Sequence, residues 1–112
     1  MKSFGRFDVV VAGGGTAGIF AAVAASRNGA KTLLVEREGA LGGVGTVGLC
    51  HNWLTFHDYR GEQVVQGLAQ ELIVRIMAEG GSIGHAEDWS GALYSRTLFD
   101  PEVFKYVALD MV

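Results

Sequence analysis

The chain has 112 residues, of which 49% are hydrophobic and 19% charged, and this composition is typical of a single folded globular domain. Its formal net charge of −3, with no basic cluster, gives no reason to expect a nucleic-acid partner, because nucleic-acid phosphates require a positive surface. The single cysteine excludes an internal disulfide framework and no zinc-ligand set is visible, so a reduced, cytoplasmic setting is expected.

The first predicted feature is a strand that runs into a helix through three spaced glycines. Residues 9–11 form the β-branched run typical of a parallel strand covered on both faces, and residues 17–28 are alanine-rich and suit a closely packed helix. Gly13 permits a sharp turn, Gly15 removes the side chain where a pyrophosphate would approach, and Gly18 lets the helix pack near the strand. The first-turn N–H groups of the helix would then face the anion.

A second apolar strand with an acid at its end gives the glycine pattern its context. Asn28 and Gly29 suit a helix C-terminus, residues 32–35 indicate a strand, and Glu36 follows directly. A carboxylate about twenty residues beyond the glycines can accept hydrogen bonds from a ribose diol. Residues 8–36 therefore predict a βαβ dinucleotide-binding unit of the α/β class, with a glycine-rich βαβ unit that binds nothing as the alternative.

Residues 37–50 hold a second glycine cluster, which a simple nicotinamide-binding domain does not need at this position. Dense glycines leave backbone amides unobstructed, so the loop can line a long, flat ligand that begins at the first turn and continues past it. The alternative is an ordinary flexible loop, because glycine-rich turns are common where a chain changes direction.

Three motifs together resemble the N-terminal segment of FAD-dependent oxidoreductases with the glutathione-reductase-type FAD-binding fold. They are GGGTAG at residues 13–18, VER at 35–37 and LGGVGT at 41–46, and they cover roughly the first half of the chain. The resemblance implies a Rossmann-like fold with an incomplete parallel sheet and additional helices. It also implies FAD as the cofactor and hydride-type oxidation or reduction of a small organic substrate.

The resemblance further implies roles for individual residues. The first turn would hold the FAD pyrophosphate, Glu36 would bind the adenosine ribose, and Arg37 would lie beside the adenine. The second loop would pass along the pyrophosphate, the ribityl chain and the flavin edge. The cofactor-binding residues expected on this basis are Gly13, Gly15, Thr16, Ala17, Gly18, Glu36, Arg37, Gly42, Gly43, Val44, Gly45 and Thr46.

Several residues beyond the second loop are candidates for chemistry, but a structural role is favoured for each. Cys50 lacks the second cysteine of a redox pair, so we expect a buried, unreactive thiol. His51, His57 and Asp58 show no metal-ligand spacing, and surface or hydrogen-bonded structural roles are expected. The aromatic residues Trp53, Phe56 and Tyr59 are expected to pack in the core, with the border of a flavin or substrate pocket as the alternative.

Three further segments complete the predicted organisation. Apolar residues repeat at helical spacing over 62–79, which predicts an amphipathic helix packed within the protein or, alternatively, against a partner helix. Residues 82–99 predict a strand or two as a possible start of a substrate-domain insertion, where Arg96 is either a partner for a substrate carboxylate or an ordinary structural charge. Asp100 as N-cap and Pro101 at the first helical position predict a helix over 100–112.

The organisation predicts that residues 1–112 are the N-terminal part of a larger FAD-binding domain. A complete dinucleotide-binding sheet has about five or six strands, and two are evident, so the rest of the same polypeptide or a homo-oligomer is the expected partner besides the substrate. An NAD-dependent dehydrogenase fragment and a non-catalytic nucleotide-binding fragment are the alternatives. Lys2 and Arg6 before the uncharged run 9–26 resemble a signal peptide, but three adjacent glycines argue against that reading and against a membrane span.

Overall fold

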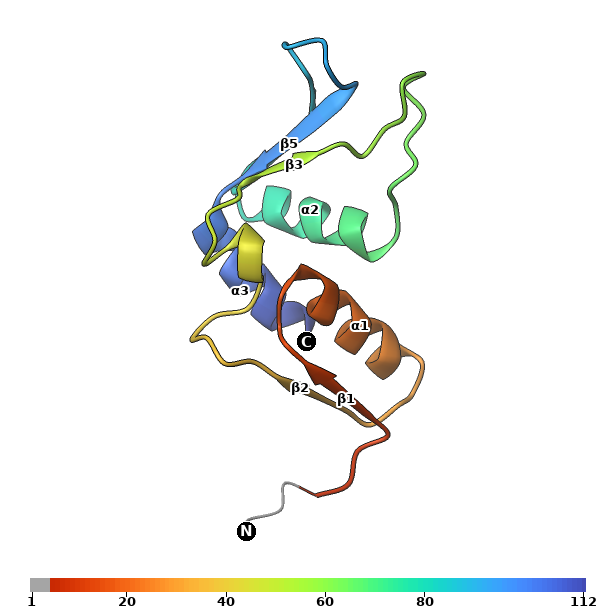
Figure 1. Cartoon of the computed structure of the whole chain (residues 1–112), viewed down its shortest axis with the longest axis vertical. Helices are drawn as coiled ribbons and strands as arrows, with labels where there is room; N and C mark the ends of the chain where they lie inside the picture. Colours follow the sequence, from red (N-terminus) through yellow and green to blue (C-terminus); the bar gives the residue numbers. More distant parts are fainter. Residues whose placement is uncertain (1–4) are drawn as a thin grey trace.

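The first part of the chain is a strand-helix-strand unit. In the computed structural model, which describes residues 5–112, β1 (Val9–Ala12) runs into α1 (Thr16–Arg27) and the chain returns through β2 (Thr32–Val35) (Figure 1). The two strands are parallel, in a register that places Val10 opposite Leu33. The expected Rossmann-like βαβ arrangement is therefore present. Lys2, on which the signal-peptide alternative partly depends, lies outside the described residues.

The two-stranded sheet is covered on one face only. α1 packs against both strands, whereas Val10 and Val35 are 60% and 50% exposed. The expectation that the first strand is covered on both faces is therefore wrong for residues 5–112. The β-branched run has the apolar character that burial in a larger parallel sheet demands, but the described residues supply only one covering layer.

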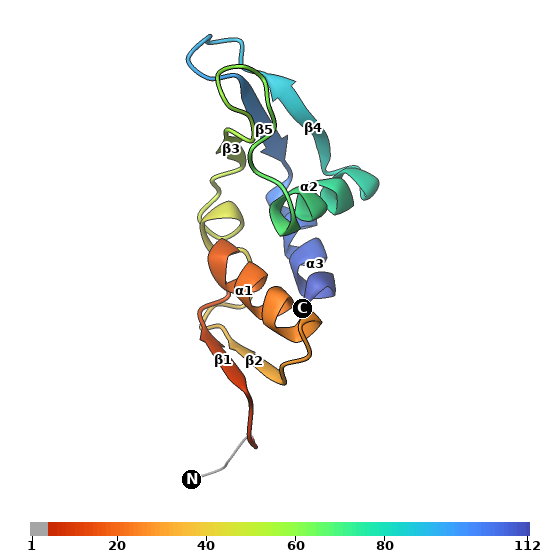
Figure 2. The same cartoon turned by 90° about the vertical axis from the view of Figure 1, so that its right-hand side faces the viewer.

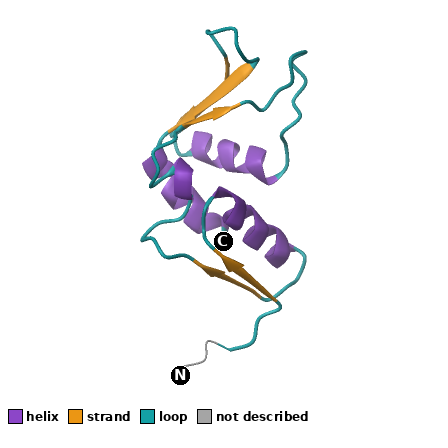
Figure 3. Cartoon of the chain, in the orientation of Figure 1, coloured by secondary structure: helices purple, strands orange, loops and turns teal. Residues whose placement is uncertain are grey.

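The second part of the chain forms an antiparallel sheet with the spatial order β3-β5-β4. Figure 2 shows this sheet with α2 beside it, and in Figure 3 the helices form a layer between the two sheets. None of the helices in residues 5–112 has the length and apolar character needed to cross a membrane. The remaining elements are η1 (Gly43–Gly45), a short 3-10 helix, β3 (Asn52–Leu54), α2 (Leu68–Ala78), β4 (Ser82–Glu87), β5 (Ser95–Phe99) and α3 (Pro101–Met111).

The helix predicted over 62–79 begins at Leu68 instead, six residues later. The amides of Val64 and Val65 both donate to the carbonyl of Phe56, at 2.9 and 3.0 Å, so this segment pairs with a distant loop rather than with its own next turn. Gly67 then takes a φ of +65°, which interrupts a helical path. The apolar spacing before Leu68 matches the helical period by coincidence. Val64, for example, is 63% exposed and does not face the core as a residue of an amphipathic helix would.

The core lies among the helices and the inner face of the second sheet. The indole of Trp53 meets the rings of Phe99 and Phe104 edge-on, with centroids 4.7 and 5.5 Å apart. The packing role expected of Trp53 and Phe56 is confirmed, whereas Tyr59 is 82% exposed because it lies in a surface turn. The buried apolar cluster consists of Ile19, Val23, Phe56, Leu72, Ile73, Ile76, Phe99, Phe104, Val107, Ala108 and Met111.

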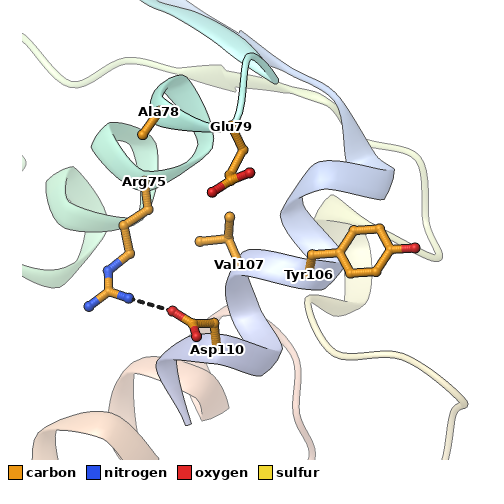
Figure 4. Close-up of a pocket in the computed structure, with 6 residues that line it drawn as sticks. All are labelled: Arg75, Ala78, Glu79, Tyr106, Val107 and Asp110. Atoms are coloured by element: carbon orange, nitrogen blue, oxygen red, sulfur yellow. Dashed lines mark hydrogen bonds and ion pairs between the residues drawn. The ribbon is translucent and has the colours of Figure 1, made fainter.

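One carboxylate connects the helices at the surface. Glu71 on α2 accepts hydrogen bonds from both terminal nitrogens of Arg27 on α1, at 2.7 and 2.8 Å, and from Nε of Arg75 at 3.0 Å. Arg75 also bonds Asp110 on α3 at 2.9 Å, across a cavity of about 470 Å³ (Figure 4). The bond from Arg27, with the smaller contribution of Arg75, lowers the pKa of Glu71 to about 2.

We expect Glu71→Gln to lower the free energy of unfolding by about 1 kcal/mol at neutral pH, because the substitution removes a bidentate ion pair at the surface. The folded pKa lies below the ordinary value of 4.5, so the carboxylate stabilises the fold above that pH and loses its contribution as the pH falls toward about 2.

The variant should therefore depend less on pH than the unmodified protein over this acidic range. Urea unfolding followed by circular dichroism measures both quantities. Glu79→Gln is the control, because Glu79 lies on the same side of the molecule and makes no ion pair within residues 5–112. Equal acid sensitivity of the protein and the Glu71 variant would contradict this interpretation.

Candidate functional site

The turn between β1 and α1 has the backbone geometry that its glycines require. Gly13 has a φ of +101°, and its N–H donates to the carbonyl of Val35 at 2.7 Å. A Cβ atom on Gly18 would lie 1.8 Å from the Gly13 carbonyl oxygen, so only glycine lets α1 approach β1 this closely. A Cβ on Gly15 would meet no atom within 4 Å, which leaves the backbone open to an approaching ligand.

The N-terminus of α1 has no side-chain cap. Gly15 is the N-cap residue, and the first turn contains no acidic residue. In α3, by contrast, the carboxylate of Asp100 accepts the N–H groups of Glu102 and Val103. Because a helix N-terminus combines a positive dipole end with N–H groups that lack helical partners, α1 retains the capacity for an external anion that α3 fills with its own aspartate.

The structure brings the second glycine loop directly against the first. The N–H of Gly42 donates to the carbonyl of Gly14 at 2.8 Å, and the hydroxyl of Thr16 donates to the carbonyl of Gly42 at 3.2 Å. A Cβ on Gly43 would lie 2.9 Å from Cα of Gly15. A side chain at Gly43 would press on the first turn, so this glycine allows two segments distant in the sequence to lie against each other. Figure 1 shows the chain after β2 returning to the turn between β1 and α1.

Other residues of the second loop point in different directions. Thr46 is fully buried, and its hydroxyl donates to the carbonyl of Leu41 at 2.6 Å, so this side chain braces the loop from within. Gly45 is also buried, and a Cβ there would lie 2.6 Å from the ring of Phe104. Val44 is exposed, as is Arg37, which forms an ion pair with the neighbouring Glu38. Contacts from Gly45 and Thr46 to any ligand would therefore come from their backbone.

The carboxylate of Glu36 is held by backbone amides. Oε1 accepts from the N–H groups of Arg37 and Glu38 at 2.6 and 2.8 Å, and Oε2 accepts from Gly14 at 2.5 Å. These bonds lower the pKa of Glu36, with the amide of Glu38 making the largest contribution and that of Gly14 the next. A carboxylate has about four acceptor positions, so one on Oε2 is left for a further donor.

A cavity of about 320 Å³ adjoins Glu36. It lies between the loop that follows β2 and the exposed side of α3, and it therefore opens beside the acid that the sequence assigns to ribose binding. The cavity in Figure 4 lies between α2 and α3 and is lined by none of the predicted site residues. The residues that line the cavity beside Glu36 are Glu36, Glu38, Gly39, Ala40, Leu41, Glu102, Lys105, Tyr106 and Leu109.

The inner face of the second sheet carries a histidine network. The hydrogen-bonded structural role expected of His57 is confirmed, whereas the part that His85 plays was not predicted from the sequence. Nδ1 of His57 lies 2.7 Å from the hydroxyl of Ser95, and Nδ1 of His85 lies 2.7 Å from the hydroxyl of Thr97. Nε2 of His85 lies 2.7 Å from the amide oxygen of Gln70 on α2. Burial lowers the pKa of His85, and the neighbouring His57 adds to the shift. No local spacing signals this network, because strand pairing brings its members together.

Cys50 is exposed, so the expectation of a buried thiol is wrong. The amide of Cys50 donates to the carbonyl of Val44, and this bond places the residue at the surface end of the second loop. Free cysteine is often buried in general, but the local loop conformation decides its position here. No group of three histidine, cysteine or acidic side chains in residues 5–112 has the geometry of a metal site.

We expect Gly43→Ala to lower the free energy of unfolding by about 1–3 kcal/mol, because a Cβ would press on the backbone of Gly15 and the residue has a positive φ of +54°. Gly39→Ala is the matched control, since Gly39 is in the same loop and a Cβ there would meet nothing within 4 Å. Urea unfolding of both variants measures the difference. Equal stability would show that the two loops do not depend on this close contact.

Comparison with known proteins places these observations in a family. No solved structure matches the chain. A family model described as FAD dependent oxidoreductase matches residues 8–112. This range contains the βαβ unit, the joined glycine loops and the second sheet, and the match confirms the resemblance seen in the sequence. The chain belongs to the FAD dependent oxidoreductase family.

Proposed function

We propose that this chain is the FAD-binding N-terminal portion of a flavin-dependent oxidoreductase that carries out hydride-type oxidation or reduction of a small organic substrate. The observation that carries the proposal is the contact between the two glycine loops beside the uncapped N-terminus of α1. FAD is long and carries two phosphates near its middle, so it suits a continuous backbone surface with an anion-binding point. Membership of an FAD-dependent family implies FAD binding.

The individual contacts are part of this proposal. The first turn would bind the pyrophosphate, and the second loop would extend the surface along the ribityl chain to the flavin edge. The bound flavin would supply the hydride-transfer chemistry, while the protein binds and orients it. The residues proposed for the pyrophosphate are Gly13, Gly15, Thr16, Ala17 and Gly18, and those proposed for the remaining length are Gly42, Gly43, Val44, Gly45 and Thr46.

The adenosine end of the proposal rests on Glu36 and its surroundings. One acceptor position of Oε2 remains for a ribose hydroxyl, so a single hydrogen bond fits without disturbing the amides that already bind this carboxylate. The adjoining cavity, with Tyr106 on one side, offers space for a ring system. Arg37 is exposed and has no contact that would prevent it from lying beside the adenine.

Three broader expectations stay within the proposal. A cytoplasmic setting is supported by the single cysteine, which has no internal disulfide partner. A small-molecule substrate follows from flavin chemistry in general. Completion of the first sheet, by the rest of the same polypeptide or by another copy of it, is supported by the exposed apolar side chains of Val10 and Val35.

We expect the purified full-length protein to show the visible absorption of bound flavin, and Glu36→Gln to weaken FAD binding about tenfold, because the substitution removes a charged acceptor from the ribose. Glu38→Gln is the matched control, since Glu38 lines the same cavity but accepts no bond from the first turn. Equilibrium titration of the flavin-free protein with FAD gives both affinities.

Thermal unfolding of each variant must be measured alongside, because Glu36 also binds three backbone amides. An unchanged FAD affinity for Glu36→Gln would contradict the assigned role of this residue. A full-length protein that binds NADH tightly and no flavin would favour the nicotinamide-dependent alternative. Binding of neither would favour a non-catalytic nucleotide-binding protein.

A further inference from the structure

The outer face of the second sheet carries an arginine in an apolar setting. Along β5, Ser95, Thr97 and Phe99 are buried against the core, so Arg96 projects from the opposite face. Because β5 is the central strand, Arg96 has a neighbour on each side, Leu54 on β3 and Ala86 on β4. Neither neighbour offers a side-chain acceptor to the guanidinium.

Two buried polar atoms on this face lack hydrogen-bond partners. Within residues 5–112, Nε of Arg96 and Oδ1 of Asn52 are the buried side-chain atoms without one. Asn52 pairs with Leu98, which lies two residues from Arg96 along β5, so the side chains of Asn52 and Arg96 share the outer face. Unpaired buried polar groups are uncommon and costly in folded proteins. The Nε–H of Arg96 is a donor and points to an external acceptor, whereas Oδ1 of Asn52 is itself an acceptor and gives no support for an anion.

The guanidinium of Arg96 forms no ion pair within the described part of the chain. No carboxylate in residues 5–112 lies within ion-pair distance of this side chain. Arg96 makes the smallest of several contributions that lower the pKa of Asp88, but that carboxylate is bound by the hydroxyl of Ser90 and the amide of Leu93. Arg96 therefore makes no direct ion pair with a carboxylate of the described chain, and an anionic acceptor is a complementary ligand for its guanidinium.

The geometry of the guanidinium suits a carboxylate. Its Cζ lies over the Trp89 ring, 5.1 Å from the ring centre. A cation–π contact uses none of the N–H groups as hydrogen-bond donors, and a planar guanidinium can bind a carboxylate through two of them. Trp89 is 77% exposed and Leu54 is 58% exposed, so apolar surface adjoins the charge. A small organic acid with a hydrocarbon group would contact both kinds of surface.

The sheet that carries Arg96 contacts the second glycine loop through Trp53 on its inner face and through the end of β5. A Cβ on Gly45 would lie 3.3 Å from the indole of Trp53, so η1 of the second loop packs against β3 (Figure 2). The amide of Phe99 at the end of β5 donates to the carbonyl of His51 at 3.1 Å, which ties β5 to the segment leaving that loop. The sheet is therefore anchored at the end of the site that the proposed function assigns to the flavin.

We propose that the outer face of this sheet binds the carboxylate of a small organic acid, with Arg96 as the carboxylate-binding residue. The description of this acid as the substrate rests on the proposed function, whereas the carboxylate site itself does not. A carboxylate at Arg96 would supply acceptors to Nε and the terminal nitrogens together, and it would neutralise the charge.

Isothermal titration calorimetry of the full-length protein tests the site with phenylacetate and its uncharged amide, phenylacetamide. We expect saturable binding of the acid and about tenfold weaker binding of the amide, because the two probes differ in charge and share the same ring. Arg96→Met should weaken phenylacetate binding about tenfold or more, and Arg96→Lys should have a smaller effect because it keeps the charge but loses the planar fork. Asn52→Asp should also weaken binding, because it places a like charge on the same face.

Arg60→Met is the matched control and should bind phenylacetate as the unmodified protein does. Arg60 also lies over an exposed aromatic ring, 5.2 Å from the centre of Tyr59, but it has no buried unpaired atom. Absence of phenylacetate binding, equal binding of the amide, or an unaffected Arg96→Met variant with intact circular dichroism would overturn the proposal. Flavin absorption of the same samples tests the proposed function separately. A flavin-free protein that still binds phenylacetate would overturn the proposed function and leave the carboxylate site standing.

Discussion

The close approach of two backbones, at Gly15 and Gly43, is the constraint on which the candidate site depends. A side chain at Gly43 would not fit between them, and the hydrogen bond from Gly42 to Gly14 fixes their separation. The first turn alone would be a short anion-binding point at a helix end. Joined to the second loop, it becomes an extended surface of peptide groups, which suits a long cofactor better than a single phosphate.

The helical layer determines where this surface lies relative to the second sheet. Phe104 on α3 packs beneath Gly45 and against Trp53 on β3, so one ring supports both the glycine loop and the sheet. At the other end of the layer, Glu71 ties α1 to α2 through Arg27. A change in any helix would therefore shift the glycine surface and the sheet relative to each other, which links the stability of the fold to the geometry of the site.

The second sheet separates two kinds of polar group on its two faces. On the inner face His57 is hydrogen-bonded to Ser95 and His85 is hydrogen-bonded to Thr97, so these polar groups have partners within the protein. On the outer face, Nε of Arg96 has no hydrogen-bond partner, and the guanidinium forms no ion pair within the described residues. Because alternate side chains along β5 point to opposite faces, Ser95 and Thr97 with their hydrogen-bond partners lie on one face, and the unpaired donor of Arg96 lies on the other. This contrast makes the outer face the one suited to an external ligand.

Much of the local structure follows from the sequence alone. The β-branched run, the glycine spacing and the acid at Glu36 identify the βαβ unit and the family, because these features report on backbone conformation within a short segment. Asp100 and Pro101 likewise identify the start of α3. Helical periodicity was misleading before Leu68, where a distant carbonyl on Phe56 takes the amides that a helix would use.

Only the tertiary structure decided which groups meet and which remain unpaired. The docking of the two glycine loops, the exposure of Cys50 and Tyr59, and the histidine network all depend on segments far apart in the chain. Arg96 was ambiguous in the sequence, since a lone arginine is compatible with any surface. The structure shows its neighbours on β3 and β4, because the partners of a side chain in a sheet are set by strand register, which local sequence does not encode.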